Sequence, residues 1–77
     1  MDIKQKIGKR IKDLRKSKNV SQEKLAELSD LDRTYINSVE NGKRNVSIVN
    51  IEKIANALGY SLQEFFTSEH FINKKNK

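Results

Sequence analysis

Side chains with complementary hydrogen-bonding groups follow one another near the middle of this 77-residue chain. Arg33 carries a planar guanidinium whose paired N–H groups match two neighbouring acceptors, such as O6 and N7 of guanine. Hydroxyl and amide groups come next, and these groups bond to phosphates and to base edges. They belong to Thr34, Tyr35, Asn37 and Ser38. The chemistry that this stretch offers is therefore recognition through hydrogen bonds.

Two short helices are predicted to position these side chains. Ser21 and Asp32 are both good helix N-caps, so the two helices are expected to start about eleven residues apart. Apolar residues follow each cap at helical spacing and are expected to be buried: Leu25, Ala26, Leu28, Ile36 and Val39. The connection at residues 29–31 is too short for anything but a sharp corner. The stretch from Ser21 to Asn41 is therefore predicted to be a helix-turn-helix with a polar outer face on its second helix.

Three further helices are predicted around this pair. The first runs from residue 3 to about residue 18 and has an apolar stripe at steps of four, four and three residues: Ile3, Ile7, Ile11 and Leu14. Another begins after Ser47 and ends at Gly59, and a short one begins after Ser61, which has capping-box spacing to Glu64. The expected fold class is all-α, a compact five-helix bundle with a central helix-turn-helix. Residues 1–66 form the expected domain, and residues 67–77 form a basic tail, partly ordered or associated with a dimer.

Backbone conformation is predictable at three positions, and a glycine within the first helix has two possible explanations. Asn19 and Asp30 are expected to adopt the left-handed conformation, Asn19 at the end of the first helix and Asp30 in the corner. Gly42 is free to take a positive φ in the turn at residues 41–45. Gly8 lies within the first helix, where it marks either a close approach by a neighbouring helix or a tolerated surface position.

Composition narrows the function classes. A net charge of +6 and a pI near 9.7 favour a polyanionic partner, and eight basic against two acidic side chains in residues 1–18 place the positive field beside the helix-turn-helix. The sequence has no cysteine and no apolar run long enough for a signal peptide or a membrane span, so a soluble, cytoplasmic protein is expected. The single histidine, His70, is expected to be solvated. No metal, no cofactor and no catalytic nucleophile–base pair is predicted, so the chain is not expected to be an enzyme.

Several further features coincide at fixed spacing. Arg15 precedes Gln22 by seven residues, Glu40 is followed by Asn-Gly, and residues 54–59 read Ile-Ala-Asn-Ala-Leu-Gly. At these positions the chain resembles the Cro/C1-type helix-turn-helix family of phage and bacterial regulators, which have a lambda-repressor-like DNA-binding domain. The resemblance covers residues 3–66. Residues 31–36 and 40–45 make the chain most similar to the controller proteins of restriction-modification systems. It departs from the family at Asn19 and Asp30, where glycine is common.

The resemblance implies roles for individual side chains. Gln22 would hydrogen-bond the DNA backbone, and Arg15 and Glu40 would form a partly buried ion pair joining the first and third helices. Arg33 is expected to contact bases. The remaining DNA contacts are expected from Thr34, Tyr35, Asn37, Ser38, Asn41, Lys43, Arg44 and Asn45. Three of these residues have a plainer alternative. Arg33 can pair with Asp30, Gln22 can be merely solvated, and Tyr35 can be half in the core.

The function that the resemblance implies is a dimeric regulator that binds a near-palindromic operator in double-stranded DNA, with RNA polymerase as a further candidate partner. Controllers of this kind set the timing of a restriction enzyme against its methyltransferase. The alternatives are a phage-type repressor or an antitoxin that represses its own operon, and, in another class, a protein–protein interaction module that keeps the fold. Five packed helices cannot hide every apolar side chain, which predicts a homodimer interface from Val49, Phe66, Phe71 and Ile72.

Overall fold

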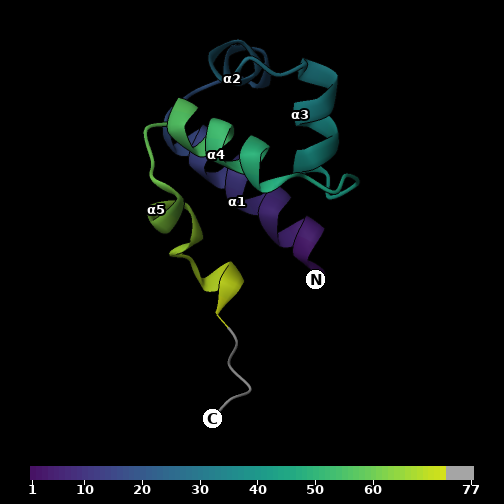
Figure 1. The fold of residues 1–77 in the computed structure, drawn as a ribbon, viewed down its shortest axis with the longest axis vertical. Helices are drawn as coiled ribbons and strands as arrows, with labels where there is room; N and C mark the ends of the chain where they lie inside the picture. The colour runs from purple at the N-terminus through teal and green to yellow at the C-terminus, as the bar shows by residue number, and fades with distance from the viewer. Residues whose placement is uncertain (73–77) are drawn as a thin grey trace.

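The computed structural model describes residues 1–72, which form five α-helices and one turn of 3-10 helix. They are α1 (Ile3–Ser17), α2 (Gln22–Ser29), α3 (Arg33–Glu40), α4 (Ile48–Ala57), α5 (Leu62–Phe66) and the 3-10 turn η1 (Glu69–Phe71). Helices α2 and α3 lie at one end of the molecule, and α5 and η1 lead toward the other end (Figure 1). Helix α4 packs against α2 and α5. The described residues contain no strand. The expected all-α, five-helix bundle with a central helix-turn-helix is confirmed.

Each α-helix begins after a side chain that accepts a hydrogen bond from the first turn. These N-caps are Asp2, Ser21, Asp32, Ser47 and Ser61. The last four were predicted, and so was the capping box between Ser61 and Glu64. A second capping box, between Asp2 and Gln5, starts α1 and was not predicted, although the spacing of Asp and Gln is that of the same motif.

The chain turns through left-handed backbone at the positions expected from residue type. Asn19 and Asp30 both have a φ of 58°, and Gly42 has a φ of 72°. Asn and Asp tolerate this conformation better than other residues with a side chain, because their short polar groups bond locally. The corner between α2 and α3 therefore keeps its sharp turn without a glycine.

One apolar core is formed by residues from all five α-helices: Ile7, Ile11, Leu14, Leu25, Ala26, Ile36, Val39, Ile51, Ile54, Ala55, Leu58 and Phe65. Two predicted core residues are exposed instead. Ile3 is 59% exposed because it lies in the first turn of α1, one turn before Ile7, the first buried residue of that helix. Leu28 is 49% exposed because Leu25, Ala26 and Ser29 already occupy the inward face of α2.

Gly8 marks a close approach between helices, the first of its two expected explanations. A Cβ atom at this position would lie 2.7 Å from the carbonyl oxygen of Glu40 and closer still to that of Val39. Any side chain there would push α3 away from α1, because the obstacle is backbone. The glycine thus sets how closely the end of α3 packs on α1.

Arg10 holds α5 against α1. Its Nε donates a hydrogen bond to the Phe65 carbonyl (2.7 Å), and its Nη2 donates to the carbonyls of Glu64 (2.8 Å) and Thr67 (3.1 Å). These carbonyls lie at the C-terminal end of α5, where helices lack internal donors and favour a cation. A residue of the first helix therefore caps the last one.

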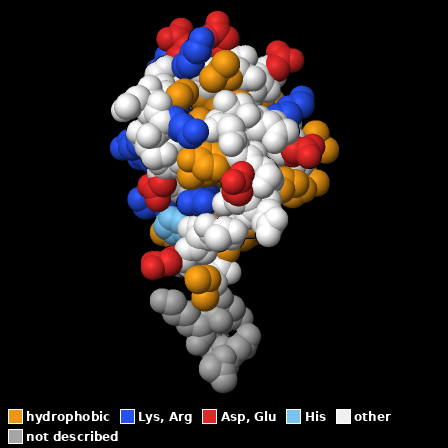
Figure 2. Space-filling model, turned by 90° about the vertical axis from the view of Figure 1, so that its left-hand side faces the viewer, with side chains coloured by type: hydrophobic (Ala, Val, Ile, Leu, Met, Phe, Trp, Pro, Cys, Tyr) orange, Lys and Arg blue, Asp and Glu red, His pale blue; other side chains and the backbone are white. Residues whose placement is uncertain are grey.

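His70 does not have the purely solvated environment expected for it. Its Nε2 lies 3.2 Å from Oδ2 of Asp13, which also pairs with Lys9, and in Figure 2 the histidine lies next to acidic and basic side chains. Burial raises the pKa of the Asp13 carboxyl, but the bonds to Lys9 and His70 outweigh this and lower it overall. The tail up to residue 72 is therefore docked on α1.

An aromatic cluster at the start of the tail contains Phe65, Phe66 and Phe71, whose neighbouring rings pack edge to face or tilted at centroid distances of 5.0–6.3 Å. Phe66 and Phe71 are consequently half-buried. The expectation that a single chain would leave both in water was wrong, because η1 folds Phe71 back onto α5. The proposed boundary at residue 66 stays a prediction, and residues 73–77 of the expected tail lie outside the described residues.

Candidate nucleic-acid interface

The outer face of α3 carries four of the ten predicted DNA contacts. Asp32 caps the helix by accepting a hydrogen bond from the Thr34 N–H (3.0 Å). Ile36 and Val39 turn inward, so Arg33, Thr34 and Asn37 are exposed. Ser38, also predicted, is half-buried beside them. This face presents a guanidinium, a hydroxyl and an amide at positions 33, 34 and 37 of one helix.

The first residue of α2 meets this face. Gln22, Arg33, Thr34 and Asn37 line a polar hollow of about 290 Å³ between the two helices, which we call the notch. Gln22 comes to the notch because Ser21 caps α2 and starts the helix beside α3. Four of the predicted DNA-binding residues, from two helices, are thus brought together.

A buried ion pair lies behind the notch. Nε of Arg15 donates to Oε2 of Glu40 (2.6 Å) and its Nη2 donates to Oε1 (3.0 Å), while the side chains are only 11% and 1% exposed. Arg15 also donates to the Val20 carbonyl (2.8 Å), in the loop before α2. The pair therefore joins α1 to the end of α3 and fixes the start of the helix-turn-helix.

Three amide side chains extend from Glu40 to the surface. Nε2 of Gln22 donates to Oε1 of Glu40 (3.0 Å), and Oε1 of Gln22 accepts from Nδ2 of Asn37 (3.2 Å). Oδ1 of Asn37 in turn accepts from Nδ2 of Asn41 (3.1 Å). We call Gln22, Asn37 and Asn41 the amide chain.

The loop between α3 and α4 carries the other predicted contacts. Lys43, Arg44 and Asn45 are all exposed. The guanidinium of Arg44 lies over the ring of Tyr35, with its carbon 5.0 Å from the ring centroid, a cation–π arrangement. The loop is therefore held against α3 by one of the cations that would clamp a phosphate.

Tyr35 is half-buried, which is the plainer of its two expected environments. Its hydroxyl accepts a hydrogen bond from Nδ2 of Asn50 (3.0 Å), in the first turn of α4. Asn50 was not predicted from the sequence, because its hydrogen bond to Tyr35 joins two helices and no local sequence pattern indicates such a contact. Asn50 holds the Tyr35 ring in the position where Arg44 covers it.

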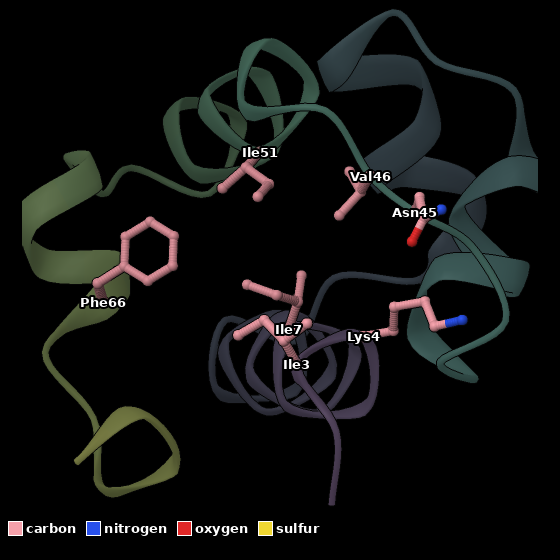
Figure 3. Close-up of a pocket in the computed structure, with 7 residues that line it drawn as sticks. All are labelled: Ile3, Lys4, Ile7, Asn45, Val46, Ile51 and Phe66. Atoms are coloured by element: carbon pink, nitrogen blue, oxygen red, sulfur yellow. The ribbon is translucent and has the colours of Figure 1, made fainter. Parts of the chain in front are cut away.

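An apolar groove of about 220 Å³ lies on a different part of the molecule (Figure 3). Ile3 and Ile7 of α1 face Ile51 of α4 and Phe66 of α5 across it, and Asn45 lines its edge instead of the notch. Of the predicted interface residues, Phe66 is thus in the groove, while Val49 is 59% and Ile72 57% exposed. The surface that a partner could cover is apolar.

Comparison with known proteins identifies the class. A family model described as helix-turn-helix matches residues 11–65, which include α2, α3 and α4. The chain belongs to the helix-turn-helix family, whose members are DNA-binding transcription factors. No helix among residues 1–72 is long and apolar enough to cross a membrane.

Particular relatives are restriction-modification control proteins. The chain is 57% identical over 67 residues to control protein C.MunI of a Mycoplasma species, covering 86% of this chain and 90% of the relative. The crystal structure of the restriction-modification controller C.AhdI from Aeromonas hydrophila matches with a TM-score of 0.78 at 52% identity, covering 82% of this chain and 96% of that one. The controller C.Esp1396I, solved as a tetramer with its natural 35 base-pair operator, matches with a TM-score of 0.81 at 39% identity, covering 86% and 87%. The resemblance to this family and to the controllers within it is confirmed.

Proposed function

We propose that this protein is a sequence-specific DNA-binding regulator that controls a restriction-modification operon through a near-palindromic operator. The observation that carries the proposal is the notch, where Arg33 and Thr34 of α3 meet Gln22 of α2 on one exposed face. A helix with its N-terminal residues at base edges and a neighbouring helix end at a phosphate is the docking geometry of helix-turn-helix proteins. An operator complex of the relative C.Esp1396I supports the same conclusion.

The residues of this face have different proposed roles. Arg33 and Thr34 contact bases, and Asn37 and Ser38 complete the polar face of α3 behind them, while Gln22, Lys43, Arg44 and Asn45 contact the DNA backbone. Arg33 has an N-terminal position on α3, where it can reach a base edge, whereas Lys43 lies on a loop and offers a point charge. Asn41 contacts DNA less directly, because its amide is bonded to Asn37.

Alanine substitution at Arg33 and Lys43 tests these roles. Arg33→Ala is expected to weaken binding to the cognate site by about 1 to 3 kcal/mol and to relax the preference at one base pair, because a bidentate contact with guanine is lost. Lys43→Ala is expected to weaken binding to all duplexes alike. Fluorescence anisotropy with selected and random duplexes measures both, and Lys53→Ala, on an exposed lysine of α4, is the matched control. Equal losses on specific and random DNA for Arg33→Ala would contradict the assignment.

The proposed operator requires two copies of the chain. Four large apolar side chains outside the helix-turn-helix are 57–59% exposed: Ile3, Ile48, Val49 and Ile72. Burying such side chains stabilises an interface by about 1.5 to 3 kcal/mol each before the entropy of association is subtracted. We therefore propose a homodimer of modest, concentration-dependent affinity in which the exposed Val49 and Ile72 become buried and the half-buried Phe66 and Phe71 complete the interface. Two-fold symmetry would place the two α3 helices about 34 Å apart, one helical turn of DNA.

Charge placed on this surface tests the dimer. Val49→Asp and Ile72→Asp are expected to shift sedimentation at micromolar concentration from dimer to monomer without unfolding the chain, because both side chains are exposed in a single chain. Leu28→Asp, on an exposed leucine of α2, is the matched control and is expected to leave the dimer intact. A wild type that stays monomeric in the absence of DNA, or variants that remain dimers, would place the interface elsewhere.

The proposed function also implies a compartment and a further partner for the protein. A regulator of this kind works in the cytoplasm, where bacterial DNA is, and we expect it to bind without catalysing a reaction. RNA polymerase remains a candidate partner at the promoter. The exposed Arg33, Thr34 and Arg44 favour DNA over the alternative of a protein–protein interaction module.

A further inference from the structure

The amide chain has a direction, and Glu40 determines it. An ionised carboxylate only accepts hydrogen bonds, so the Gln22 amide must turn its Nε2 toward Glu40. This turns Oε1 of Gln22 toward Asn37, which must therefore donate with its own nitrogen, and Asn41 repeats the pattern. Turning any one amide over would set two acceptors against each other with no proton between them. The direction therefore follows from chemistry at one buried end.

Glu40 is well suited to impose this direction. Its side chain is 1% exposed, and both of its oxygens accept from Arg15, which holds the carboxylate in place. Its Oε1 is shared between Arg15 and Gln22. A rigid acceptor in the protein interior is thereby connected to polar atoms in the notch.

We propose that Glu40 is a positioning residue for DNA binding, which fixes the Gln22 and Asn37 amides so that the second N–H of Gln22 donates to a phosphate of the DNA backbone. An amide nitrogen has two N–H groups, and only one of those of Gln22 donates to Glu40. A phosphate oxygen only accepts, so the direction of the amide decides where the notch offers a donor. Asn37 then supports Gln22 instead of making a contact of its own. The inference deepens the proposed function and rests on it.

A double-mutant cycle on affinity tests whether Asn37 acts through Gln22. Gln22→Ala is expected to weaken binding by about 10-fold or more on every duplex, the loss of a hydrogen bond to a charged group. Asn37→Ala is expected to weaken it several-fold. The double variant should bind as Gln22→Ala does, because the supported contact is already gone. Anisotropy with a duplex selected by the wild type measures all four proteins, and multiplicative losses would show that Asn37 contacts DNA independently and would overturn the proposal.

Glu40→Gln tests whether Glu40 sets the direction of the amide chain. The substitution keeps the volume, but the new amide can donate as well as accept, so Gln22 is free to turn over. Affinity, corrected for the folded fraction from circular dichroism, is expected to fall to that of Gln22→Ala, and adding Gln22→Ala should cost nothing more. A full further loss would mean that Glu40 does not orient Gln22, which overturns the proposal.

Gln22→Ala and Arg33→Ala together separate a failure of this inference from a failure of the proposed function. If Gln22→Ala binds like the wild type while Arg33→Ala loses its sequence preference, the inference is wrong and the proposed function stands. If the wild type prefers no duplex sequence, both are wrong.

Discussion

Affinity for operator DNA is expected to fall by about 10³- to 10⁵-fold when salt is raised from about 50 to about 200 mM. A dimer is expected to make roughly six to ten phosphate contacts, and each contact releases counterions that are condensed on the DNA. This release becomes less favourable as the salt concentration rises, so the affinity falls. The chain carries a net charge of +6, and the exposed Lys43 and Arg44 lie on the loop next to α3. Electrostatic contacts with phosphates are therefore expected to dominate the free energy of binding.

Titrations at several salt concentrations give the number of contacts directly, from the slope of log affinity against log salt. Lys43→Ala is the informative variant, because the loss of one phosphate contact should reduce the slope by about one. Lys53→Ala, on α4, should leave the slope unchanged. A flat response of the wild type would count against binding through the DNA backbone.

Removal of one member of the buried ion pair is expected to cost a large part of the stability of the fold. Glu40→Ala leaves the Arg15 guanidinium, 11% exposed, without its carboxylate, and such a loss destabilises proteins by about 3 to 5 kcal/mol. A domain of this size has only about 4 to 12 kcal/mol in total. Urea unfolding followed by circular dichroism measures the difference. Glu52→Ala, on an exposed glutamate of α4, is the matched control and should be nearly neutral.

The reason for the loss can be separated from the loss itself. Replacing both partners with apolar residues, Arg15→Met with Glu40→Leu, is expected to recover much of the stability, because no charge is then left buried alone. If the double variant is instead as unstable as the sum of the two single variants, the pair is not coupled as the structure indicates.

The helix-turn-helix was predictable because its signals are local. Ser21 and Asp32 act through side chains that bond two or three residues along the chain, and the left-handed Asp30 is a property of one residue. The polar face of α3 follows once Ile36 and Val39 are assigned to the core. Residue types within a dozen positions were thus enough to predict the two helices and the outward face of α3, whereas the role of Gln22 came from the family resemblance.

What sequence reasoning missed depends on contacts between distant residues. Arg10 and α5 are joined across 54 to 57 positions, and His70 meets Asp13 across 57. No spacing rule connects such residues, because only the packed helices bring them together. The exposure of Ile3 and Leu28 was missed for the same reason. A helical period shows which residues share a face of a helix, but not how much of that face the neighbouring helices cover.

Helix α1 contacts both ends of the molecule, and this limits which operators the protein can read. Gly8 and Arg15 fasten it to α3, while Arg10 fastens it to the end of α5. In the proposed dimer through Val49, Phe66, Phe71 and Ile72, the position of each α3 is therefore fixed relative to the α3 of the partner subunit. One extra base pair between half-sites rotates the second half-site by roughly 34° and moves it by roughly 3.4 Å. The protein has no hinge in α1 with which to follow, so we expect the proposed dimer to select one spacing of the half-sites in addition to the bases within them.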